Sequence, residues 1–334
     1  MSPASSPPTT PAQARTLAEH ISVEQIGPNV FRSRYQPEKM GNAANIAYGG
    51  CALGVAVNAA CQTVPSQYLL YSVTGHFLAP VSTEQKLTCS VRRLRDTRTF
   101  ATRQVEITQT QADMTTRLCM IILADFQKEG ERVMLSYSTP PDRTYSPPEA
   151  CLTPQEIGTD MVKRGILTEE AFAQYTKLFS LIARFFETRQ TPEGVSGQNF
   201  NGMAKAHPTG QDALPLTART SADWFRVRHP IPHRLEEYAG LAFVLDAFLS
   251  FLPLAHSGMF LDDAGACASL DFSMRVFAAD WGLENWHLRE LKTVAGADGR
   301  TYTEARMWDQ GGRLVANMTQ QCILRPKREL KAVL

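Results

Sequence analysis

Two apolar stretches decide the fold: residues 48–60 read YGGCALGVAVNAA, and residues 238–250 read YAGLAFVLDAFLS. Each opens on Tyr-x-Gly and continues for the length of a helix without a polar face. The first stops before Pro65 and the second before Pro253, and proline ends a helix because it lacks an N–H and clashes with the preceding turn. A helix that is apolar on every side must be surrounded by protein. The sequence therefore predicts two fully buried helices, the second reaching Phe251.

After each helix the pattern changes to the alternation that is typical of strands. Strands are expected near residues 68–78, 86–94, 99–108 and 115–126 in the first half, and near residues 267–277, 286–294, 301–308 and 313–324 in the second. A sheet that curls around one helix buries that helix completely. The prediction is an α+β double hotdog: two tandem repeats, each an antiparallel sheet wrapped around a central helix. The alternative is an ordinary α+β protein whose helices lie in a larger core, and the repeat argues against it.

The repeats set the expected domain limits. They are a disordered tail at 1–15, an N-terminal hotdog at 16–128, a linker with a helical segment at 129–221, a C-terminal hotdog carrying Asp246 at 222–326, and a tail at 327–334. Inside the linker, Thr168 and the two glutamates that follow it predict the start of a helix. Residues 194–217 have the composition of a loop.

The composition is that of an ordinary globular protein. The 334 residues include 34 Lys and Arg against 33 Asp and Glu, which gives a net charge of +1. A nucleic-acid-binding protein would show a basic excess on one face, so nucleic acid is not an expected partner. The longest apolar run, residues 241–255, contains Asp246 and is shorter than the roughly 20 residues that a bilayer requires. No membrane span is expected.

The cysteines and the termini bear on compartment and metal binding. The seven cysteines are an odd number and have neither Cys-x-x-Cys nor zinc spacing, so we expect no metal site and a reducing compartment. Residues 1–11 lack the apolar core of a secretory signal. The C-terminal Lys-Ala-Val-Leu is only distantly similar to a peroxisomal Ser-Lys-Leu signal. We expect a cytoplasmic protein, with the peroxisome as the alternative.

Asp246 is the most informative residue for function. None of its neighbours three or four positions away on a helix is cationic, so no local ion pair compensates its charge. Burial should raise its pKa above about 3.9, unless hydrogen bonds to the carboxylate oppose the effect, and such a group can act as a general base. The alternative is a carboxylate that caps a loop or pairs with a distant arginine. Ala56 holds the matching position in the first repeat, which predicts one active site per chain.

Two further polar residues lie near the apolar faces of strands. Alternation places Gln320 on the apolar face of the last strand, where it needs partners and where it could orient a water beside Asp246. A glutamine bonded to backbone near the end of the strand explains the pattern nearly as well. Alternation places Ser269 on the opposite face from Leu270 and Phe272, so the strand must bulge for Ser269 to reach the other two. A plain strand serine is the default interpretation.

Three other residues are candidates for contact with a substrate. Gly49 and Gly50 begin a helix, where free N–H groups and the positive end of the dipole can hold an oxyanion or phosphate. Close packing under the sheet is the alternative. His76, beside Phe77 in a strand, could line a pocket, although a buried histidine with satisfied hydrogen bonds is the commoner case. The sequence contains no GxSxG motif, no HExxH motif and no P-loop motif.

Taken in order, these residues resemble the acyl-CoA thioesterase II family, the double-hotdog thioesterases of bacteria and of eukaryotic peroxisomes. The resemblance covers most of the chain outside the tail and the linker. In the first half it rests on Tyr48-Gly49-Gly50-x-x-Leu53-Gly54, Gln62-Thr63-Val64-Pro65, Phe77-Leu78-x-Pro80, Leu94-Arg95-Asp96-x-x-x-Phe100-x-x-Arg103 and Phe126-Gln127. In the second half it rests on Asp246 with Phe251-Leu252-Pro253, on Ser269-Leu270-Asp271-x-Ser273-Met274, and on Gly312-x-Leu314-Val315-Ala316 followed by Gln320.

The resemblance implies a water-activating set of Asp, Thr or Ser, and Gln. By position these are Asp246, Ser269 and Gln320, which would hydrolyse an acyl-CoA thioester directly, with backbone N–H groups stabilising the oxyanion and without a metal, cofactor or covalent acyl-enzyme. Acyl-CoA is then the expected substrate, and we expect a homo-oligomer. Ser269 stands where threonine is commoner in the family, which keeps the hydroxyl.

Departures from the family keep other functions open. Residues 42–45 read NAAN where relatives tend to carry a basic residue, which leaves the contacts to the CoA phosphates unassigned. A specialised substrate, such as a natural-product or carrier-protein-bound acyl thioester, is one alternative. A non-catalytic acyl-binding protein is another, against which Asp246 and Gln320 argue. A hotdog hydratase would pair its Asp with a His, and no His accompanies Asp246 in the helix.

Overall fold

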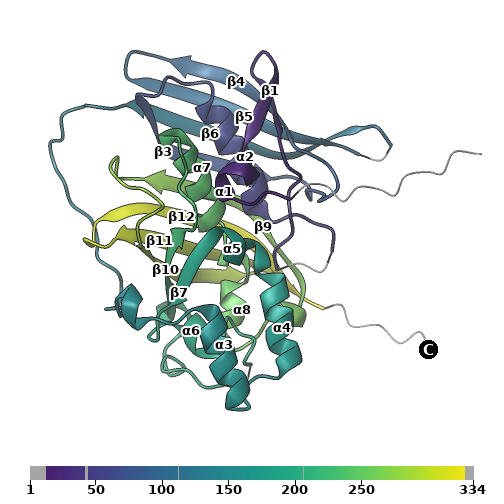
Figure 1. Cartoon of the computed structure of the whole chain (residues 1–334), viewed down its shortest axis with the longest axis vertical. Helices are drawn as coiled ribbons and strands as arrows, with labels where there is room; N and C mark the ends of the chain where they lie inside the picture. Colours follow the sequence, from purple (N-terminus) through teal and green to yellow (C-terminus); the bar gives the residue numbers. More distant parts are fainter. Residues whose placement is uncertain (1–12, 42–43, 112, 206, 328–334) are drawn as a thin grey trace, which may run out of the picture.

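The computed structural model describes residues 13–41, 44–111, 113–205 and 207–327, and these form one antiparallel sheet with helices inside and below it (Figure 1). The N-terminal half contributes β1 (Val23–Gly27), β2 (Val30–Ser33), β3 (Tyr68–Phe77), β4 (Thr88–Asp96), β5 (Phe100–Thr110) and β6 (Thr116–Lys128). The C-terminal half contributes β7 (Phe186–Gln190), β8 (Thr220–Val227), β9 (Ala264–Val276), β10 (His287–Ala297), β11 (Arg300–Asp309) and β12 (Leu314–Pro326).

The order of the strands has two matching halves. Across the described residues it runs β1-β2-β4-β5-β6-β3-β9-β12-β11-β10-β8-β7, so each half repeats the same connectivity in mirror order about the β3–β9 pair. That central pair is antiparallel and matches residues 72–76 with residues 271–275. The eight strands predicted from the sequence are all present. Each half is a sheet curled around one helix, so the predicted double hotdog is confirmed.

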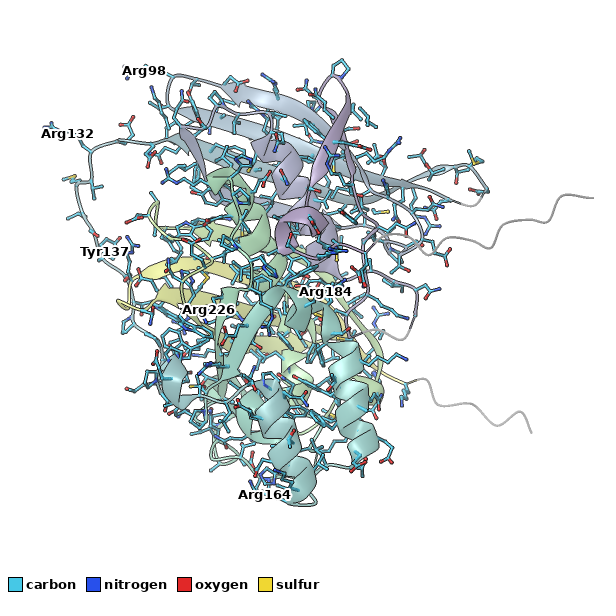
Figure 2. The ribbon with its side chains drawn as sticks, viewed as in Figure 1. Arg98, Arg132, Tyr137, Arg164, Arg184 and Arg226 are labelled. Carbon is cyan, nitrogen blue, oxygen red and sulfur yellow. The ribbon has the colours of Figure 1, made fainter. Side chains whose placement is uncertain are left out.

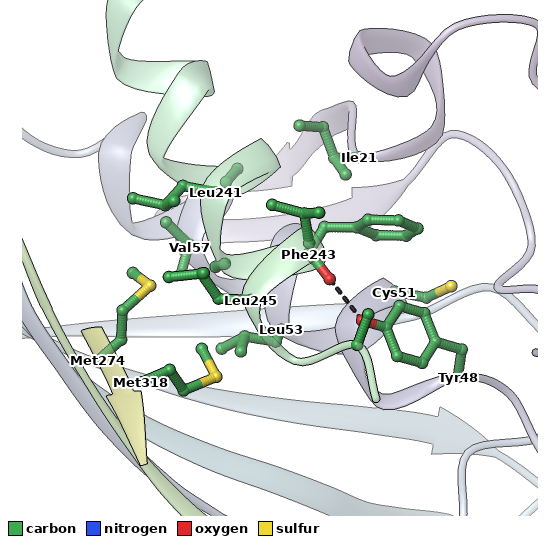
Figure 3. Packing of buried hydrophobic residues seen from close by; sticks show 14 of the residues in the cluster. Ile21, Tyr48, Cys51, Leu53, Val57, Leu241, Phe243, Leu245, Met274 and Met318 are labelled. Atoms are coloured by element: carbon green, nitrogen blue, oxygen red, sulfur yellow. Dashed lines mark hydrogen bonds between the residues drawn. The ribbon is translucent and has the colours of Figure 1, made fainter. Parts of the chain in front are cut away.

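The two central helices are α2 (Gly49–Cys61) and α7 (Arg234–Leu245). Every residue of α2 from Gly50 to its end is buried, as the all-apolar sequence predicts. The two helices pack directly on each other, with Leu53 and Val57 beside Leu241 and Leu245 (Figure 3). A Cβ at Gly50 would lie 2.6 Å from the Phe243 carbonyl oxygen and one at Gly54 3.1 Å from that of Ala239, so the close approach of the backbones requires glycine.

The predicted linker, residues 129–221, was wrong in one respect: much of it belongs to the second repeat. It contains α3 (Pro154–Lys163), α4 (Glu169–Leu178), α5 (Ser180–Phe185), α6 (Val195–Asn199) and all of β7. β7 pairs with β8 and is the edge strand that corresponds to β1. The sequence does not reveal it, because β7 has only five residues, four of them polar, and follows a helix without a turn signal. Figure 1 shows α3, α4 and α6 together below the sheet.

The tails largely lie outside the described residues. Of the predicted N-terminal tail at 1–15, only residues 13–15 are described, and these pack against the protein, with Ala14 buried. They lead directly into α1 (Leu17–His20), whose Thr16 and Glu19 form a capping box. Residues 13–15 therefore belong to the folded part of the chain, and the rest of the predicted tail lies outside the described residues. Of the predicted C-terminal tail at 327–334, only Lys327 is described.

The second apolar helix is broken, contrary to the prediction that it continues to Phe251. α7 ends at Leu245, Phe248 adopts a left-handed conformation with φ of 75°, and a helix resumes as α8 (Leu252–His256). Residues 234–256 together are long and apolar enough to cross a membrane. Their most apolar window of 18 residues has a mean hydropathy of 1.7, and 94% of that window is buried inside the protein. One such stretch is weak evidence for a span, and the expected absence of a span stays a prediction.

Candidate active site

The candidate site lies where α7 ends, where α2 begins, and where β12 passes both. Asp246 is the residue immediately after α7, and its side chain is only 6% exposed. The Gln320 side chain, on the inner face of β12, is fully buried and donates a hydrogen bond from Nε2 to Oδ1 of Asp246. The two residues are 74 positions apart in the chain. The buried amide thus has the partner that the sequence pattern required.

The first turn of α2 supplies the other partners of the carboxylate. The backbone N–H of Gly50 faces the Asp246 carboxylate. The hydroxyl of Tyr48 donates to the Phe243 carbonyl oxygen at 2.5 Å (Figure 3), and it lies close enough to the carboxylate to stabilise its charged form. A Cβ on Gly49 would lie 2.9 Å from Oδ2 of Asp246. The helix has no acidic residue in its first turn and no side-chain cap. Asp246 therefore provides the negative charge that the start of a helix favours.

The environment raises the pKa of Asp246 from 3.8 to about 6. Burial is the largest cause, because the charged form loses its hydration. Hydrogen bonds from Gln320, Gly50 and Tyr48 stabilise the carboxylate and oppose that rise. The result is a carboxylate that is mostly ionised at neutral pH and still basic enough to accept a proton.

Ser269 reaches the site through a bulge in β9. The register between β9 and β12 shifts where Gln321 faces Asp271 and Cys322 faces Ser269, which leaves Leu270 as the extra residue. Ser269 then lies half-buried on the same side as Gln320 and donates from Oγ to Oε1 of the amide at 3.1 Å. Strict alternation places it on the other face, so the bulge is the feature that brings the three side chains together.

The three side chains form an ordered chain of hydrogen bonds. Ser269 donates to the oxygen of the Gln320 amide, and the nitrogen of that amide donates to Asp246, so the two contacts fix the orientation of the amide. The Ser269 end is half-exposed, whereas the Asp246 end is buried. Such a cluster can hold a water molecule between a hydroxyl and a carboxylate and remove its proton.

The structure does not bring His76 to this cluster. His76 is exposed and faces away from the helices, while Phe77, the next residue in β3, packs against Gly49. Gly49 and Gly50 begin α2 beside Asp246, and the N–H of Gly50 faces the Asp246 carboxylate. Their contact with a substrate stays a prediction. Within the described ranges, no three His, Cys, Asp or Glu side chains gather in a way that could hold a metal, and all seven cysteines are free thiols.

Sequence reasoning missed Tyr48 as a member of the site. Its pKa is raised well above the ordinary value, first by burial and then by the neighbouring Asp246, so the phenol keeps its proton and acts as a donor. The signal was present in the sequence, because Tyr48 directly precedes the Gly-Gly pair at the start of a buried helix. Only the fold shows that this helix start faces the end of α7.

Sequence comparison identifies the two halves. Residues 36–127 match the acyl-CoA thioesterase N-terminal domain, and residues 182–324 match the acyl-CoA thioesterase C-terminal domain. The chain belongs to the acyl-CoA thioesterase family. It is accordingly a thioester hydrolase. It is similar to acyl-CoA thioesterase 2 of Haemophilus influenzae, with 23% identity over 316 residues that span 92% of this chain and 96% of the relative.

Solved structures of similar proteins share the fold of this thioesterase. An acyl-CoA thioesterase II of Mycobacterium marinum superposes with a TM-score of 0.63 at 20% identity, covering 92% of this chain and 97% of that one. A hot dog fold protein of Alicyclobacillus acidocaldarius gives a TM-score of 0.62 at 15% identity, with 92% and 97% covered. The N-terminal match ends at residue 127 and the C-terminal match begins at residue 182, so α3 and α4 fall outside both.

Proposed function

We propose that the protein hydrolyses acyl-CoA thioesters to a free acid and CoA, using a water molecule activated by Asp246, Ser269 and Gln320. The observation that carries the proposal is the buried Asp246 carboxylate, which has hydrogen-bond donors around it and no ion-pair partner among the described residues. A buried carboxylate that is not neutralised costs stability. A role as a general base accounts for its retention, because the same burial raises its pKa to about 6.

In the proposed reaction, the Ser269 hydroxyl and the Asp246 carboxylate hold the water. Asp246 accepts one proton from it, and the resulting hydroxide forms a C–O bond to the thioester carbonyl carbon. The tetrahedral intermediate then collapses, the C–S bond breaks, and the thiolate of CoA leaves with the electron pair. The proton on Asp246 passes to that thiolate, which restores the carboxylate. No covalent bond to the protein forms.

Gln320 and Gly49 have supporting roles in this proposal. The Gln320 amide keeps Asp246 and Ser269 at a fixed separation, since it bonds to both. Gly49 is the first residue of α2, where a backbone N–H has no partner within the helix. We assign the oxyanion contact to the Gly49 N–H, because that of Gly50 is bound to Asp246.

The test measures thiol release from a panel of acyl-CoAs that differ in chain length, branching and ring content. Asp246→Asn should lower kcat by about 10²- to 10⁴-fold, the usual contribution of a general base. Ser269→Ala should also lower kcat, whereas Ser269→Thr keeps the hydroxyl and should keep most of the activity. Asp160→Asn, a substitution of the same kind at an exposed position of α3, is the matched control.

Each outcome of this test is informative. Equal rates for wild type and Asp246→Asn would disprove the assignment of the base. If no CoA thioester is cleaved, the same acyl groups should be tested as thioesters of an acyl carrier protein. Cleavage of those thioesters would show that the substrate is carried by the protein and not by CoA. Inactivity on both would favour an acyl-binding protein.

A further inference from the structure

A buried ion pair lies directly behind the segment that carries Asp246, and the proposed reaction does not use it. Arg289 on β10 is fully buried and Asp223 on β8 is 4% exposed. The guanidinium binds the carboxylate with two parallel hydrogen bonds, Nε to Oδ1 at 3.0 Å and Nη2 to Oδ2 at 2.8 Å. This is the forked geometry in which arginine binds a carboxylate most rigidly.

The third arm of Arg289 reaches the end of α7. Its Nη1 donates to the carbonyl oxygen of Val244 at 2.7 Å and lies 3.4 Å from that of Ala247. These two carbonyls lie on either side of Asp246, at the point where the helix is broken. The Val244 carbonyl also accepts the backbone N–H of Ala247 at 3.2 Å, so the local turn supplies one partner and Arg289 supplies a charged second one. A carbonyl oxygen has two lone pairs and can accept both.

The rings of two phenylalanines enclose the guanidinium. Phe225 and Phe248 lie 5.5 and 5.4 Å from its central carbon, measured to the ring centres. Phe248 is the residue with the left-handed conformation, two positions after Asp246, and it also stacks on Phe179 of the segment that joins α4 to α5. The backbone around Asp246 is therefore fixed by Arg289 through both hydrogen bonds and ring contacts.

The first repeat contains a comparable arginine without a carboxylate to position. Arg103 on β5 is 1% exposed and donates from Nη2 to the Thr63 carbonyl oxygen at 3.2 Å, just beyond the end of α2. Its acidic partner, Asp96, is 53% exposed. Each repeat thus holds the end of its central helix with a buried arginine. Only in the second repeat does that helix end at a carboxylate.

We propose that Arg289, oriented by Asp223, is a positioning residue that holds the Asp246 carboxylate against Gly50 and Gln320 by binding the carbonyls on both sides of it. The proposal rests on the proposed function, in which Asp246 is the base. It explains why the chain keeps a buried ion pair, which is often no more stabilising than a well-packed apolar pair. A displacement of about 1 Å at a reacting group can lower a rate about 100-fold.

The other titratable groups that face Asp246 are neutral. Tyr48 and Cys51 approach from the first turn of α2, and Cys322 approaches from β12. Burial raises the pKa of each of these three groups, so they carry no charge between pH 5 and 9. The acid limb of a pH–rate profile should therefore report on Asp246 and on the geometry that Arg289 maintains.

The test compares kcat, KM and the pH–rate profile of Arg289→Met with those of Arg103→Met. We expect Arg289→Met to lower kcat about tenfold or more with little change in KM, and to move the acid limb to higher pH, because the donors around Asp246 separate from it and Asp223 loses its counter-charge. Arg103→Met should lower the Tm but leave kcat and the acid limb unchanged. Arg289→Lys keeps the charge and should recover part of kcat.

A double variant keeps the proposal testable if Arg289→Met does not fold. Arg289→Met with Asp223→Leu removes both buried charges, which should restore the Tm while the two carbonyls lose the guanidinium as a donor. We expect kcat to stay low. Full activity in this double variant, together with an inactive Asp246→Asn, would overturn the positioning role alone. A fully active Asp246→Asn would overturn the proposed function itself.

Discussion

The burial that raises the pKa of Asp246 also lowers the free energy of unfolding at neutral pH. Its folded-state pKa of about 6 is above the value of 3.8 in an unfolded chain, so between these pH values the folded protein binds more protons than the unfolded one. Under that condition the free energy of unfolding falls as pH rises. The carboxylate is thus destabilising at neutral pH, where the proposed reaction needs it ionised.

The pH dependence of stability should reveal this effect. Wild type should lose on the order of 2–3 kcal/mol of its free energy of unfolding between pH 4 and pH 7 through Asp246 alone. Asp246→Asn should lose correspondingly less over the same range, as measured by urea unfolding at several pH values. Asp160→Asn is the control, and an equal slope for wild type and Asp246→Asn would contradict the raised pKa.

The residues of the site differ in how far the sequence predicts them. Asp246 and Gln320 stand out because each is a polar residue in an apolar pattern. Ser269 does not, since the bulge at Leu270 depends on strand pairing across 51 positions. Tyr48 and Arg289 were missed because each looks like an ordinary member of its element. Their roles depend on where α7 ends, which is a property of the fold.

At the scale of elements, the start of α2 and the end of α7 are built for close contact. Gly49 lies against the Asp246 carboxylate and Gly50 lies against the carbonyl of Phe243. The oppositely charged ends of the two helix dipoles meet here, with one carboxylate between them. The site therefore depends on the backbone of α2 as much as on side chains.

Gly49→Ala should damage catalysis more than stability. The new Cβ would lie 2.9 Å from Oδ2 of Asp246 and 3.0 Å from the ring of Phe77, so the carboxylate must move. Alanine has the higher helix propensity, which limits the loss of stability. We expect kcat to fall about tenfold or more while circular dichroism stays unchanged. Gly296→Ala, whose Cβ has no neighbour closer than 3.6 Å, is the matched control and should retain full activity.

The strands and the first helix were predicted to within a few residues, because alternation and all-round apolarity are local patterns. The break after Leu245 was not predicted, since residues 246–250 contain neither Gly nor Pro. The left-handed Phe248 is imposed by tertiary contacts with Arg289 and Phe179. β7 was missed for a similar reason, because only its pairing with β8 makes it a strand.

At the scale of the whole molecule, the two repeats are joined by the β3–β9 pair, by the contact between α2 and α7, and at the surface by the ion pair of Glu129 with Arg234. Beyond Glu129, the covalent connection is an exposed loop, residues 130–138, on which Figure 2 labels Arg132 and Tyr137. Its apolar side chains at 133–135 and 137 are 74–93% exposed. The halves therefore do not need this loop to stay together.

A cut in this loop should leave the enzyme active. With a specific protease site inserted between Arg132 and Val133, cleavage should yield two fragments that elute together and keep the kcat of the uncut protein. The uncut insertion variant is the control. Separation of the fragments with loss of activity would show that the loop, and not the sheet and helices, holds the repeats in place.

Size-exclusion chromatography with light scattering tests the expected homo-oligomer. Its mass would be a multiple of 37.0 kDa.

The unbroken α2, with Ala56 where the second repeat has Asp246, has a consequence for how such a chain evolves. Two identical repeats would each carry a complete set of reactive groups. Under the proposed function, the second repeat supplies the base and the first repeat supplies a helix start, so the two repeats should differ in their tolerance of mutation. Deep mutational scanning should find that position 56 accepts Ser or Cys readily, whereas position 246 accepts almost nothing.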